Sequence, residues 1–469
     1  MSWSASTPAR PKGKTGLALL LFAIAAALLA YTTEGLGKKG KIPTGLPVYG
    51  VLMVAGFLIA WLVVRKTARR ADPVLLPVAA LLAGLGFAMI ARIQSPEPQL
   101  ASIAQSQFTW IMIGLLAFVL TLLVIRDDRQ LDALTYTIGL AGIVMLLLPV
   151  VPGVGATING APLWVHAGPL SFQPAEFGKV LIVIFLASYL SAKRELLASG
   201  VGRFGLPRVK DLGPVILAWG TSLVVLFLEK DIGASLLFFG VFVVMLWLAT
   251  GRPGYLLLGL VLFVIGAVVG YILFSHVQDR VAYWLHALEP AHVQAQGYGQ
   301  LAQGWFAMAS GGLVGTGLGQ GSPTLIPLSW NDFIFAAFGE ELGFIGCATL
   351  LLMYLVIIGR GLRVAVERTD DFGKLLATGL TTMVALQTFV IVGGVTRLIP
   401  LTGITLPFVS YGGSSLVANF VILALLVRVS AGPWTRETRD PEKPRKQREP
   451  LWISKKDQAA AAAATQETA

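Results

Sequence analysis

Charged residues and cysteine are both scarce in this 469-residue chain. Only 13% of the residues are charged, whereas soluble globular domains carry roughly a quarter. The single cysteine, Cys347, excludes a disulfide within the chain and any metal cluster held by several cysteines. The four histidines, at 166, 276, 286 and 292, lack the HExxH spacing of zinc proteases. The composition therefore argues against a soluble domain, a disulfide scaffold and a zinc or haem enzyme.

Long apolar stretches recur from one end of the chain to the other, and 55% of all residues are hydrophobic. A helix needs about 20 apolar residues to cross a bilayer. A membrane-exposed backbone must satisfy its own hydrogen bonds, and these stretches are too long and unalternating for barrel strands. We therefore predict an all-α, polytopic bundle of about twelve transmembrane helices. The expected spans are residues 16–33, 46–64, 73–93, 108–125, 134–152, 174–191, 212–228, 232–250, 254–275, 333–357, 373–394 and 413–429.

The distribution of lysine and arginine predicts the orientation of these spans. With the N-terminus inside, 28 of the 36 basic residues fall on the cytoplasmic side. Because cytoplasmic loops carry an excess of Lys and Arg, this bias places both termini in the cytoplasm of a multi-pass membrane protein. It also accounts for the net charge of +11 without a nucleic-acid partner. Two long polar segments, 153–173 and 276–332, are then expected on the outer face, where long loops often carry function.

Ionisable residues inside or beside the spans are costly and are therefore the candidate functional positions. Glu176 and Lys179 stand three residues apart in SFQPAEFGK, so they project from one helix face. Two interpretations stay open: a self-neutralising ion pair, or the wall of a polar cavity in which Lys179 meets an anionic ligand. Pro174 suits the first helical turn, and Gln173 before it is a candidate polar contact.

Asp332 stands where the second long segment passes into an apolar span, in LSWNDFIFAAFGEELGFIG. An acidic residue in this position is most often a helix N-cap. Its place at a membrane mouth instead favours a carboxylate that meets a lipid-linked head group. For Glu340 and Glu341, about two turns deeper, a structural hydrogen bond to another helix is the favoured interpretation. Asp231, in EKDIGAS, is best explained as a helix cap at a tight turn.

The stretch from 399 to 415, IPLTGITLPFVSYGGSS, combines prolines, glycines and hydroxyl side chains, Ser414 among them. Irregular backbone at membrane depth persists only when it is buried or lines a cavity, so we predict a cavity wall. Arg397, just before it, has two interpretations: a bidentate phosphate contact, or a side chain that extends to the membrane interface, which is the commoner case. Arg280, in HVQDRVAYW, has the same two.

Three separated strings, LSFQPAEFGK, NDFIFAAFGEELG and LTGITLPFVSYGGSS, resemble the SEDS family in order and spacing. This is the shape, elongation, division and sporulation group typified by RodA and FtsW. DIGAS at 231–235 also resembles the family's DLGT-type turn. Trp330 and Asn331 stand where the family usually has His-Thr. The family usually has ten spans, so the resemblance implies an additional helix pair at 16–64 and a catalytic core at 73–429, with the large outer loop 276–332. Charge and composition predict a cytoplasmic N-tail at 1–15 and a disordered basic and alanine-rich cytoplasmic tail at 430–469.

The resemblance implies a peptidoglycan glycosyltransferase that polymerises lipid II beside a class B penicillin-binding protein. Asp332 matches the family's essential loop aspartate, and Glu176 and Lys179 match the polar pair of its central cavity. Because the donor is α-linked and the product β-linked, the reaction inverts the anomeric carbon and needs a base, for which we choose Asp332. Lys179, Arg280 and Arg397 are the expected cations for the lipid pyrophosphate.

Gln173 and Ser414 complete the predicted substrate-binding set. The chain shows no dedicated metal cage, so Mg²⁺ or Mn²⁺ would be shared with the phosphates. Two other functions stay open: a lipid II flippase, and a scaffold that only positions cell-wall enzymes. The sequence does not decide between a role in elongation and one in division.

Overall fold

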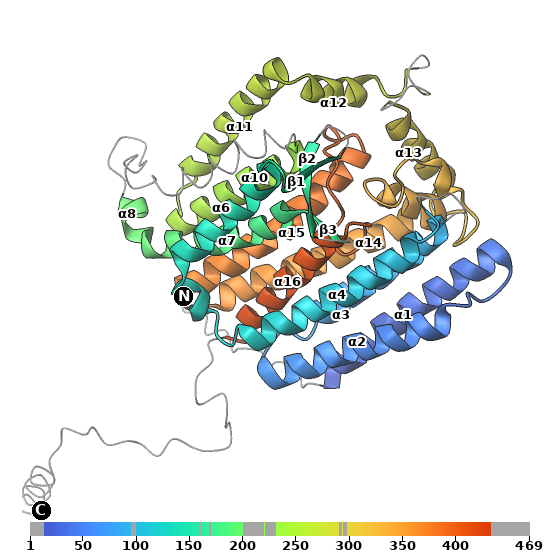
Figure 1. Cartoon of the computed structure of the whole chain (residues 1–469), viewed down its shortest axis with the longest axis horizontal. Helices are drawn as coiled ribbons and strands as arrows, with labels where there is room; N and C mark the ends of the chain where they lie inside the picture. Colours follow the sequence, from blue (N-terminus) through green and yellow to red (C-terminus); the bar gives the residue numbers. More distant parts are fainter. Residues whose placement is uncertain are drawn as a thin grey trace, which may run out of the picture. The chain divides into compact units, whose positions relative to one another are not determined.

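The computed structural model describes residues 14–94, 100–158, 161–167, 170–199, 220, 231–289, 293 and 298–432. Within these residues, ten helices are long and apolar enough to cross a membrane. They coincide with ten of the twelve predicted spans (Figure 1). These helices are α1 (Lys14–Lys39), α2 (Leu46–Thr67), α3 (Leu75–Ile93), α4 (Ile103–Val124), α7 (Pro174–Ala192), α10 (Ile232–Thr250), α11 (Gly254–Leu273), α14 (Ile334–Glu367), α15 (Asp371–Val395) and α16 (Gly413–Ser430).

The two remaining predicted spans have different outcomes. The span expected at 134–152 forms the shorter helix α6 (Thr135–Leu147), followed by the 3-10 turn η1 (Leu148–Val150). A helix of 13 residues rises only about 20 Å, less than the ~30 Å thickness of the hydrocarbon core. Apart from Gly220, the span expected at 212–228 lies outside the described residues, as does the tail at 433–469. The number twelve therefore stays a prediction.

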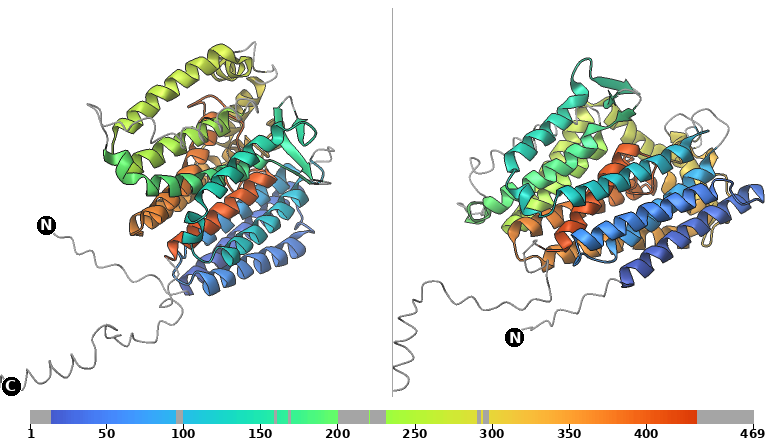
Figure 2. Two further views of the ribbon diagram at one scale, coloured as in Figure 1. Left: turned by 60° about the vertical axis from the view of Figure 1, so that its left-hand side comes forward. Right: turned by 60° about the horizontal axis from the view of Figure 1, so that its bottom comes forward.

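A small β-sheet departs from the all-α prediction. The first long polar segment folds into β1 (Gly155–Ile158), β2 (Ala161–Ala167) and β3 (Leu170–Phe172), antiparallel in the order β1-β2-β3. Val165 pairs with Gly155 on one side and with Phe172 on the other. The sheet lies at one end of the helices (Figure 2). Its strands escaped prediction because windows long enough to detect membrane spans average over segments of three to seven residues.

The second long polar segment is also largely folded. It contains α12 (Ser275–His286), α13 (Tyr298–Gly311) and the 3-10 turn η3 (Pro323–Leu325). Short helices α5 (Arg129–Asp132) and α8 (Arg194–Ser199) follow α4 and α7 in the chain. A segment that the composition marked only as a long loop thus presents several fixed elements near the start of α14.

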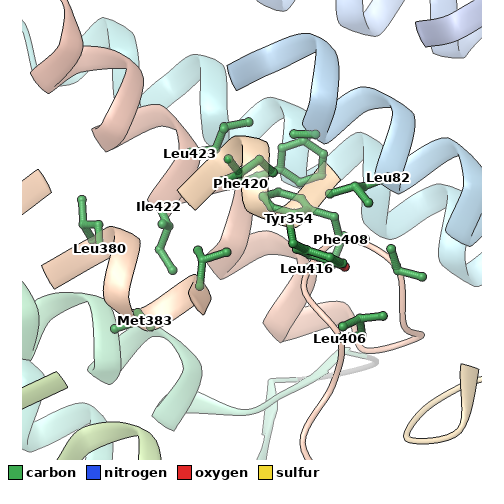
Figure 3. Close-up of a cluster of buried hydrophobic side chains, with 14 of the residues drawn as sticks. Leu82, Tyr354, Leu380, Met383, Leu406, Phe408, Leu416, Phe420, Ile422 and Leu423 are labelled. Carbon is green, nitrogen blue, oxygen red and sulfur yellow. The ribbon is translucent and has the colours of Figure 1, made fainter. Parts of the chain in front are cut away.

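Helix α16 forms the centre of the bundle, and nearly all its residues are buried. It packs against α3, α4, α7, α14 and α15. Figure 3 shows Tyr354 of α14 in the apolar core beside Leu82, Phe408 and Phe420. The hydroxyl of Tyr354 donates a 2.6 Å hydrogen bond to the carbonyl of Pro407. This bond satisfies a buried polar group and attaches the irregular 399–412 segment to α14.

The two ends of the bundle gather different residues. At the end that we call the Asp332 end, the starts of α7, α10, α14 and α16 come together. At the opposite end, the Asp128 end, Asp128 follows α4 and pairs with Arg368, which follows α14. There Arg428 of α16 also donates to the carbonyls of Thr67 and Leu122, near the ends of α2 and α4. Helix α1 begins and α16 ends at the Asp128 end.

Candidate active site

Asp332 lies in the turn just before α14, and its side chain is only 6% exposed. The N-cap residue of α14 is Phe333, and no side chain caps this helix end. The helix-cap interpretation of Asp332 is therefore wrong. Among the described residues none donates a hydrogen bond to its carboxylate, and Oδ1 is fully buried. A buried carboxylate oxygen without a partner is costly, so this oxygen is a strong candidate for contact with a ligand.

The surroundings of Asp332 change its acidity. Burial raises the pKa of Asp332 to about 6; the positive charge of Arg280 opposes this rise and the Asp231 carboxylate adds to it. A carboxylate with a pKa near 6 is mostly ionised at neutral pH and accepts a proton more readily than an ordinary aspartate. Both properties are those of a general base.

Gly403 separates Asp332 from Arg280. Its φ of +81° belongs to the left-handed region that glycine adopts without strain. A Cβ atom built on Gly403 would lie 3.6 Å from Nη2 of Arg280 and 3.7 Å from Oδ2 of Asp332. The guanidinium and the carboxylate therefore approach the same point above the Gly403 backbone. A side chain at this position would occupy the space between the two charged groups.

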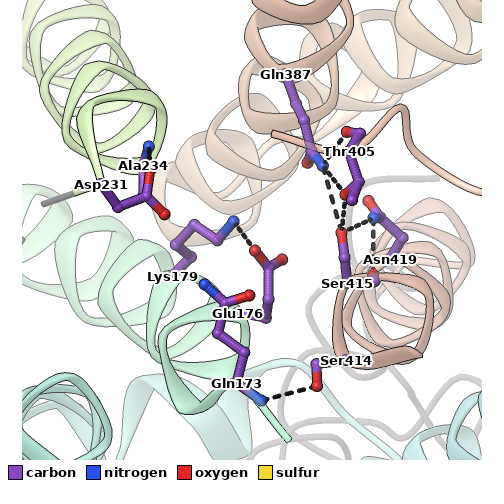
Figure 4. Close-up of polar contacts among 10 residues, drawn as sticks. All are labelled: Gln173, Glu176, Lys179, Asp231, Ala234, Gln387, Thr405, Ser414, Ser415 and Asn419. Atoms are coloured by element: carbon purple, nitrogen blue, oxygen red, sulfur yellow. Dashed lines mark hydrogen bonds and ion pairs between the residues drawn. The ribbon is translucent and has the colours of Figure 1, made fainter. Parts of the chain in front are cut away.

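A second group of charges lies at the starts of α7 and α10 (Figure 4). Nζ of Lys179 is 2.6 Å from Oε1 of Glu176, and the two side chains are 3% and 12% exposed. The ion pair, one of the two interpretations left open, is present, and a contact of Lys179 with an anionic ligand stays a prediction. Asp231 caps α10 by accepting a 2.8 Å hydrogen bond from the amide of Ala234, so this interpretation is also confirmed. Burial raises the pKa of Asp231, whereas that hydrogen bond and the charge of Lys179 lower it.

Helix α16 packs against α7. The hydroxyl of Ser414 accepts a 2.8 Å hydrogen bond from the main-chain amide of Gln173. The two residues predicted to contact the substrate are thus bonded to each other. Figure 4 shows a neighbouring polar cluster beyond them. Its hydrogen bonds join Gln387 to Thr405 and Ser415, Thr405 to Ser415, and Asn419 to Ser415. Hydroxyl side chains of the glycine- and hydroxyl-rich stretch therefore belong to a polar cluster, and its role as a cavity wall stays a prediction.

Arg397 is held by main-chain groups of α12. Its Nε donates to the carbonyl of Trp284 at 3.0 Å, and Nη2 donates to that of Leu285 at 3.2 Å. The guanidinium also lies over the ring of Trp305, 5.5 Å from its centre. These contacts fix the start of the irregular stretch to α12. A phosphate contact from Arg397 stays a prediction, with two of its N–H groups already engaged.

Glu340 and Glu341 both make structural contacts. Oε1 of Glu341 is 2.8 Å from Nε of Arg92 on α3, which confirms the expected bond to another helix. Oε1 of Glu340 accepts a 2.8 Å hydrogen bond from the amide of Ser322. Both residues lie on α14, after Asp332 in the chain. Their contacts attach this helix to α3 and to Ser322.

Sequence reasoning missed three polar groups near Asp332. Ser329 Oγ, Asn331 Oδ1 and Thr402 Oγ1 are buried atoms without a hydrogen-bond partner in the described structure. A Cβ on Gly233 of α10 would lie 3.2 Å from this Thr402 oxygen, which places Thr402 beside the turn capped by Asp231. Thr402 and Gly403 thus connect the Lys179 region to Asp332. Their only sequence signal was membership of the irregular stretch.

The residue types at the site bear on metal binding. Within the described ranges, no three His, Cys, Asp or Glu side chains are grouped so as to hold a metal ion. Asp332, Asp231 and Glu176 are carboxylates on separate elements, and Asp231 is close enough to interact electrostatically with each of the other two. A divalent cation there would therefore depend on oxygen atoms supplied by the substrate.

Comparison with known proteins places this arrangement in a family. The FtsW, RodA and SpoVE family, described as cell cycle proteins, matches residues 73–433. The peptidoglycan glycosyltransferase RodA of Mycobacterium tuberculosis is 44% identical over 437 residues, which cover 91% of this chain and 92% of that protein. Stage V sporulation protein E of Bacillus subtilis is 37% identical, covering 61% of this chain and 76% of its own.

Two solved structures share the fold. A chain from a study of how a peptidoglycan synthase complex coordinates polymerization and crosslinking has a TM-score of 0.61 at 28% identity, covering 80% of this chain and 99% of its own. The crystal structure of the rod shape determining protein RodA of Thermus thermophilus has a TM-score of 0.53 at 27% identity, covering 80% and 98%. The resemblance found in the three strings is thereby confirmed. This multi-pass membrane chain belongs to the FtsW, RodA and SpoVE family.

Proposed function

We propose that this chain, a peptidoglycan glycosyltransferase, polymerises lipid II with Asp332 as the general base. The observation that carries this assignment is the buried carboxylate of Asp332. It has no partner among the described residues, and it shares the space above Gly403 with Arg280. A structural aspartate would be expected to have at least one oxygen paired, as Asp231 has at the start of α10 and Asp128 has with Arg368.

The proposed reaction is a single inverting displacement at a sugar carbon. Asp332 takes the proton from the 4-hydroxyl of the acceptor sugar while that oxygen forms a bond to C1 of the donor. The bond from C1 to the phosphate oxygen breaks, and the lipid pyrophosphate leaves with the electron pair. Attack and departure on opposite faces convert the α-linked donor into a β-linked product. A pKa near 6 suits a base that must be ionised before it accepts this proton.

We assign the first cation for the leaving pyrophosphate to Arg280. Its guanidinium donates no hydrogen bond to any residue in the described part of the chain, and the group lies beside Asp332. Lys179 is already paired with Glu176, and Arg397 with main-chain carbonyls. We expect these two to shape the cavity and to add positive potential. In a site with little water, fixed cations stabilise developing negative charge more strongly than in solution.

We further propose that both termini lie in the cytoplasm and that the Asp332 end faces outward. In support, α1 begins and α16 ends at the Asp128 end, and the excess of basic residues falls on that side. Twelve spans follow if the region around 212–228 crosses once and α6 with η1 completes another crossing. Helices α1 and α2 are then an addition to the 73–429 core, because the family match begins at residue 73.

We propose a class B penicillin-binding protein as the partner, since a structural relative comes from a peptidoglycan synthase complex. Mg²⁺ or Mn²⁺ stays a prediction. Such an ion would neutralise pyrophosphate charge, held chiefly by the phosphates with Asp332 or Asp231 as the nearest carboxylates of the chain.

The direct test is polymerisation of lipid II by the purified protein with its transpeptidase partner. The first prediction is that Asp332→Asn lowers the rate by about 10²- to 10⁴-fold, because a general base contributes on this scale. The matched control is Asp279→Asn, which removes the same charge from an exposed position on α12, one residue from Arg280. We expect this control to polymerise at nearly the wild-type rate.

Normal glycan synthesis by a folded Asp332→Asn protein would contradict the assignment. The same variant separates the two other functions. A flippase would move lipid II across liposomes without making glycan, whatever stands at position 332. A scaffold would support normal growth and shape with asparagine there.

A further inference from the structure

Helix α14 is interrupted eleven residues after Asp332. Gly343 has φ +66° and ψ −165°, far from helical values. In a continuous helix, the carbonyls of Glu340 and Glu341 would accept from the amides four residues later. Here they accept instead from the amides of Thr316 and Gly317, each at 2.9 Å. The residues before the break, 334–342, form a separate segment that we call the lead segment.

The amides released by the break have partners in the same loop. Phe344 donates to the carbonyl of Gly312 at 2.9 Å, and Ile345 donates to that of Leu313 at 3.1 Å. The helix loses two hydrogen bonds at the break. Residues 312–317 supply new partners for both carbonyls and both amides. We call residues 312–322 the inserted loop. The direction of the lead segment is set by this loop, because the helix itself does not continue through Gly343.

Side chains strengthen the contact between the inserted loop and the lead segment. Oε2 of Glu341 accepts from the amide of Gly319 at 3.0 Å. Arg92, which pairs with Glu341, also donates from Nη2 to the carbonyl of Gly321 at 2.5 Å. Together with the hydrogen bond from the amide of Ser322 to Glu340, these contacts attach residues 319–322 of the loop to α14 and α3. A buried ion pair with further hydrogen bonds fixes geometry more firmly than an exposed pair.

Helix α1 holds the inserted loop from its other side. Nε2 of Gln320 donates to the carbonyl of Gly37 at 2.8 Å. Nζ of Lys38 donates to the carbonyls of Arg92 and Gln94 at the end of α3, at 2.7 and 2.8 Å, and so reaches the loop through Arg92, whose side chain bonds Gly321. A Cβ on Gly37 would lie 2.1 Å from the carbonyl oxygen of Leu318, so the two backbones touch. The loop is thus enclosed between α1 and the lead segment.

We propose that α1 is a positioning element for the active site: through Gly37, Lys38 and the inserted loop, it fixes the lead segment that places Asp332. The proposal rests on the proposed role of Asp332. It also assigns a task to a helix that precedes the family match at residue 73. In this proposal the residues of α1 act through the inserted loop and are positioning residues. A displacement of about 1 Å at a reacting group can cost 10²-fold in rate, so a firm hold on the lead segment affects turnover.

The test compares two neighbouring lysines of α1 in the full-length protein with its transpeptidase partner. Lys38→Met removes the donor to Arg92 and Gln94, and Lys39→Met removes the same charge from an exposed position. We expect Lys38→Met to lower kcat for lipid II polymerisation by about 10- to 100-fold with KM little changed. Lys39→Met is expected to match wild type, and Lys38→Arg to restore most of the rate.

Hydrogen exchange of the amides in 312–322 and 334–342 provides a readout that does not depend on catalysis. Faster exchange in both segments of Lys38→Met, at an unchanged melting temperature, is the expected result. Gln320→Ala, at an exposed position, is a second variant with the same expected effect in case Lys38→Met does not fold.

Equal kcat and equal exchange in Lys38→Met and Lys39→Met would overturn the proposal. A lower kcat without faster exchange in either segment would also overturn it, because the loop would then not be the connection. If Asp332→Asn polymerises normally, the role of Asp332 fails instead. Faster exchange in Lys38→Met would still support the hold of α1 on the loop in that case.

Discussion

Two buried aspartates, one at each end of the helical bundle, have opposite surroundings. At the Asp128 end, Oδ2 of Asp128 is 2.5 Å from Nη2 of Arg368, and the two side chains are 1% and 5% exposed. Arg368 also pairs with Asp370 at 2.7 Å. At the Asp332 end, the Asp332 carboxylate is almost as buried, yet no described residue pairs with it.

This difference distinguishes a buried charge that holds helices together, Asp128, from a buried charge that is available to a ligand, Asp332. A buried ion pair ties α4, α14 and α15 together at the Asp128 end, and its removal would leave an uncompensated charge. The unpaired carboxylate at the Asp332 end contributes nothing of this kind to folding. Burial alone therefore does not identify a functional residue; burial without a partner does so more sharply.

Replacing Asp128 or Asp332 by asparagine is the strongest test of this comparison. Asp128→Asn leaves the Arg368 charge in a buried site with only Asp370 as partner, so we expect a loss of about 3 kcal/mol in the free energy of unfolding. Asp332→Asn is expected to leave that free energy nearly unchanged or to raise it. Thermal and denaturant unfolding in detergent measure both, with Asp127→Asn as the control.

The expected activities of these variants run in the opposite order. Folded Asp128→Asn should polymerise lipid II at close to the wild-type rate. A comparable stability loss in both variants would show that the two ends do not differ in the way described.

The space between Arg280 and Asp332 is tested by a methyl group at Gly403. Gly403→Ala places a Cβ where both charged groups approach. We expect polymerisation to fall by about tenfold or more, since small displacements at reacting groups are costly. Gly251→Ala is the matched control, because Gly251 has φ +68° and nothing within 4 Å of the added Cβ.

Both alanines strain a left-handed backbone by about 1–2 kcal/mol. Their stabilities should therefore fall together, whereas their activities should diverge. Equal activity in the two variants would show that the space above Gly403 is not used by the substrate.

The smallest expected effect concerns pH. Burial raises the pKa of Asp332 to about 6, and only the ionised form can act as a base. The polymerisation rate should therefore rise with pH up to about 6, by about tenfold per unit below that value, and then level off. Arg280→Met removes the charge that opposes the rise, so the inflection should move to higher pH. A profile that stays flat below pH 6 would contradict Asp332 as the base.

Ten of the twelve expected spans appear as long apolar helices because hydropathy acts locally, residue by residue along a helix. The ion pair of Glu176 and Lys179 was also predictable, since residues three apart share a helix face. The cap at Asp231 follows from the same local logic. Asp332 was placed by resemblance rather than by pattern, because pattern alone favoured a cap that the structure does not show.

The break at Gly343 was not predicted, because the stretch 333–357 was taken as one continuous span. It depends on a loop twenty to thirty residues earlier that supplies the replacement hydrogen bonds. The sheet at 155–172 was hidden by its short strands. Thr402 and Gly403 could not be singled out within their stretch, because their importance comes from Arg280, Gly233 and Asp332 on other elements.

The sequence by itself determined that the chain is a helical membrane protein and which residues carry charge at the helix ends, because both follow from local composition. Its three strings also determined the family. Only the tertiary structure decided which buried charged groups of the described residues have a partner and which have none. Arg92 and Arg368, the partners of Glu341 and Asp128, come from parts of the chain distant in sequence, and whether they arrive within hydrogen-bond distance depends on how the helices pack.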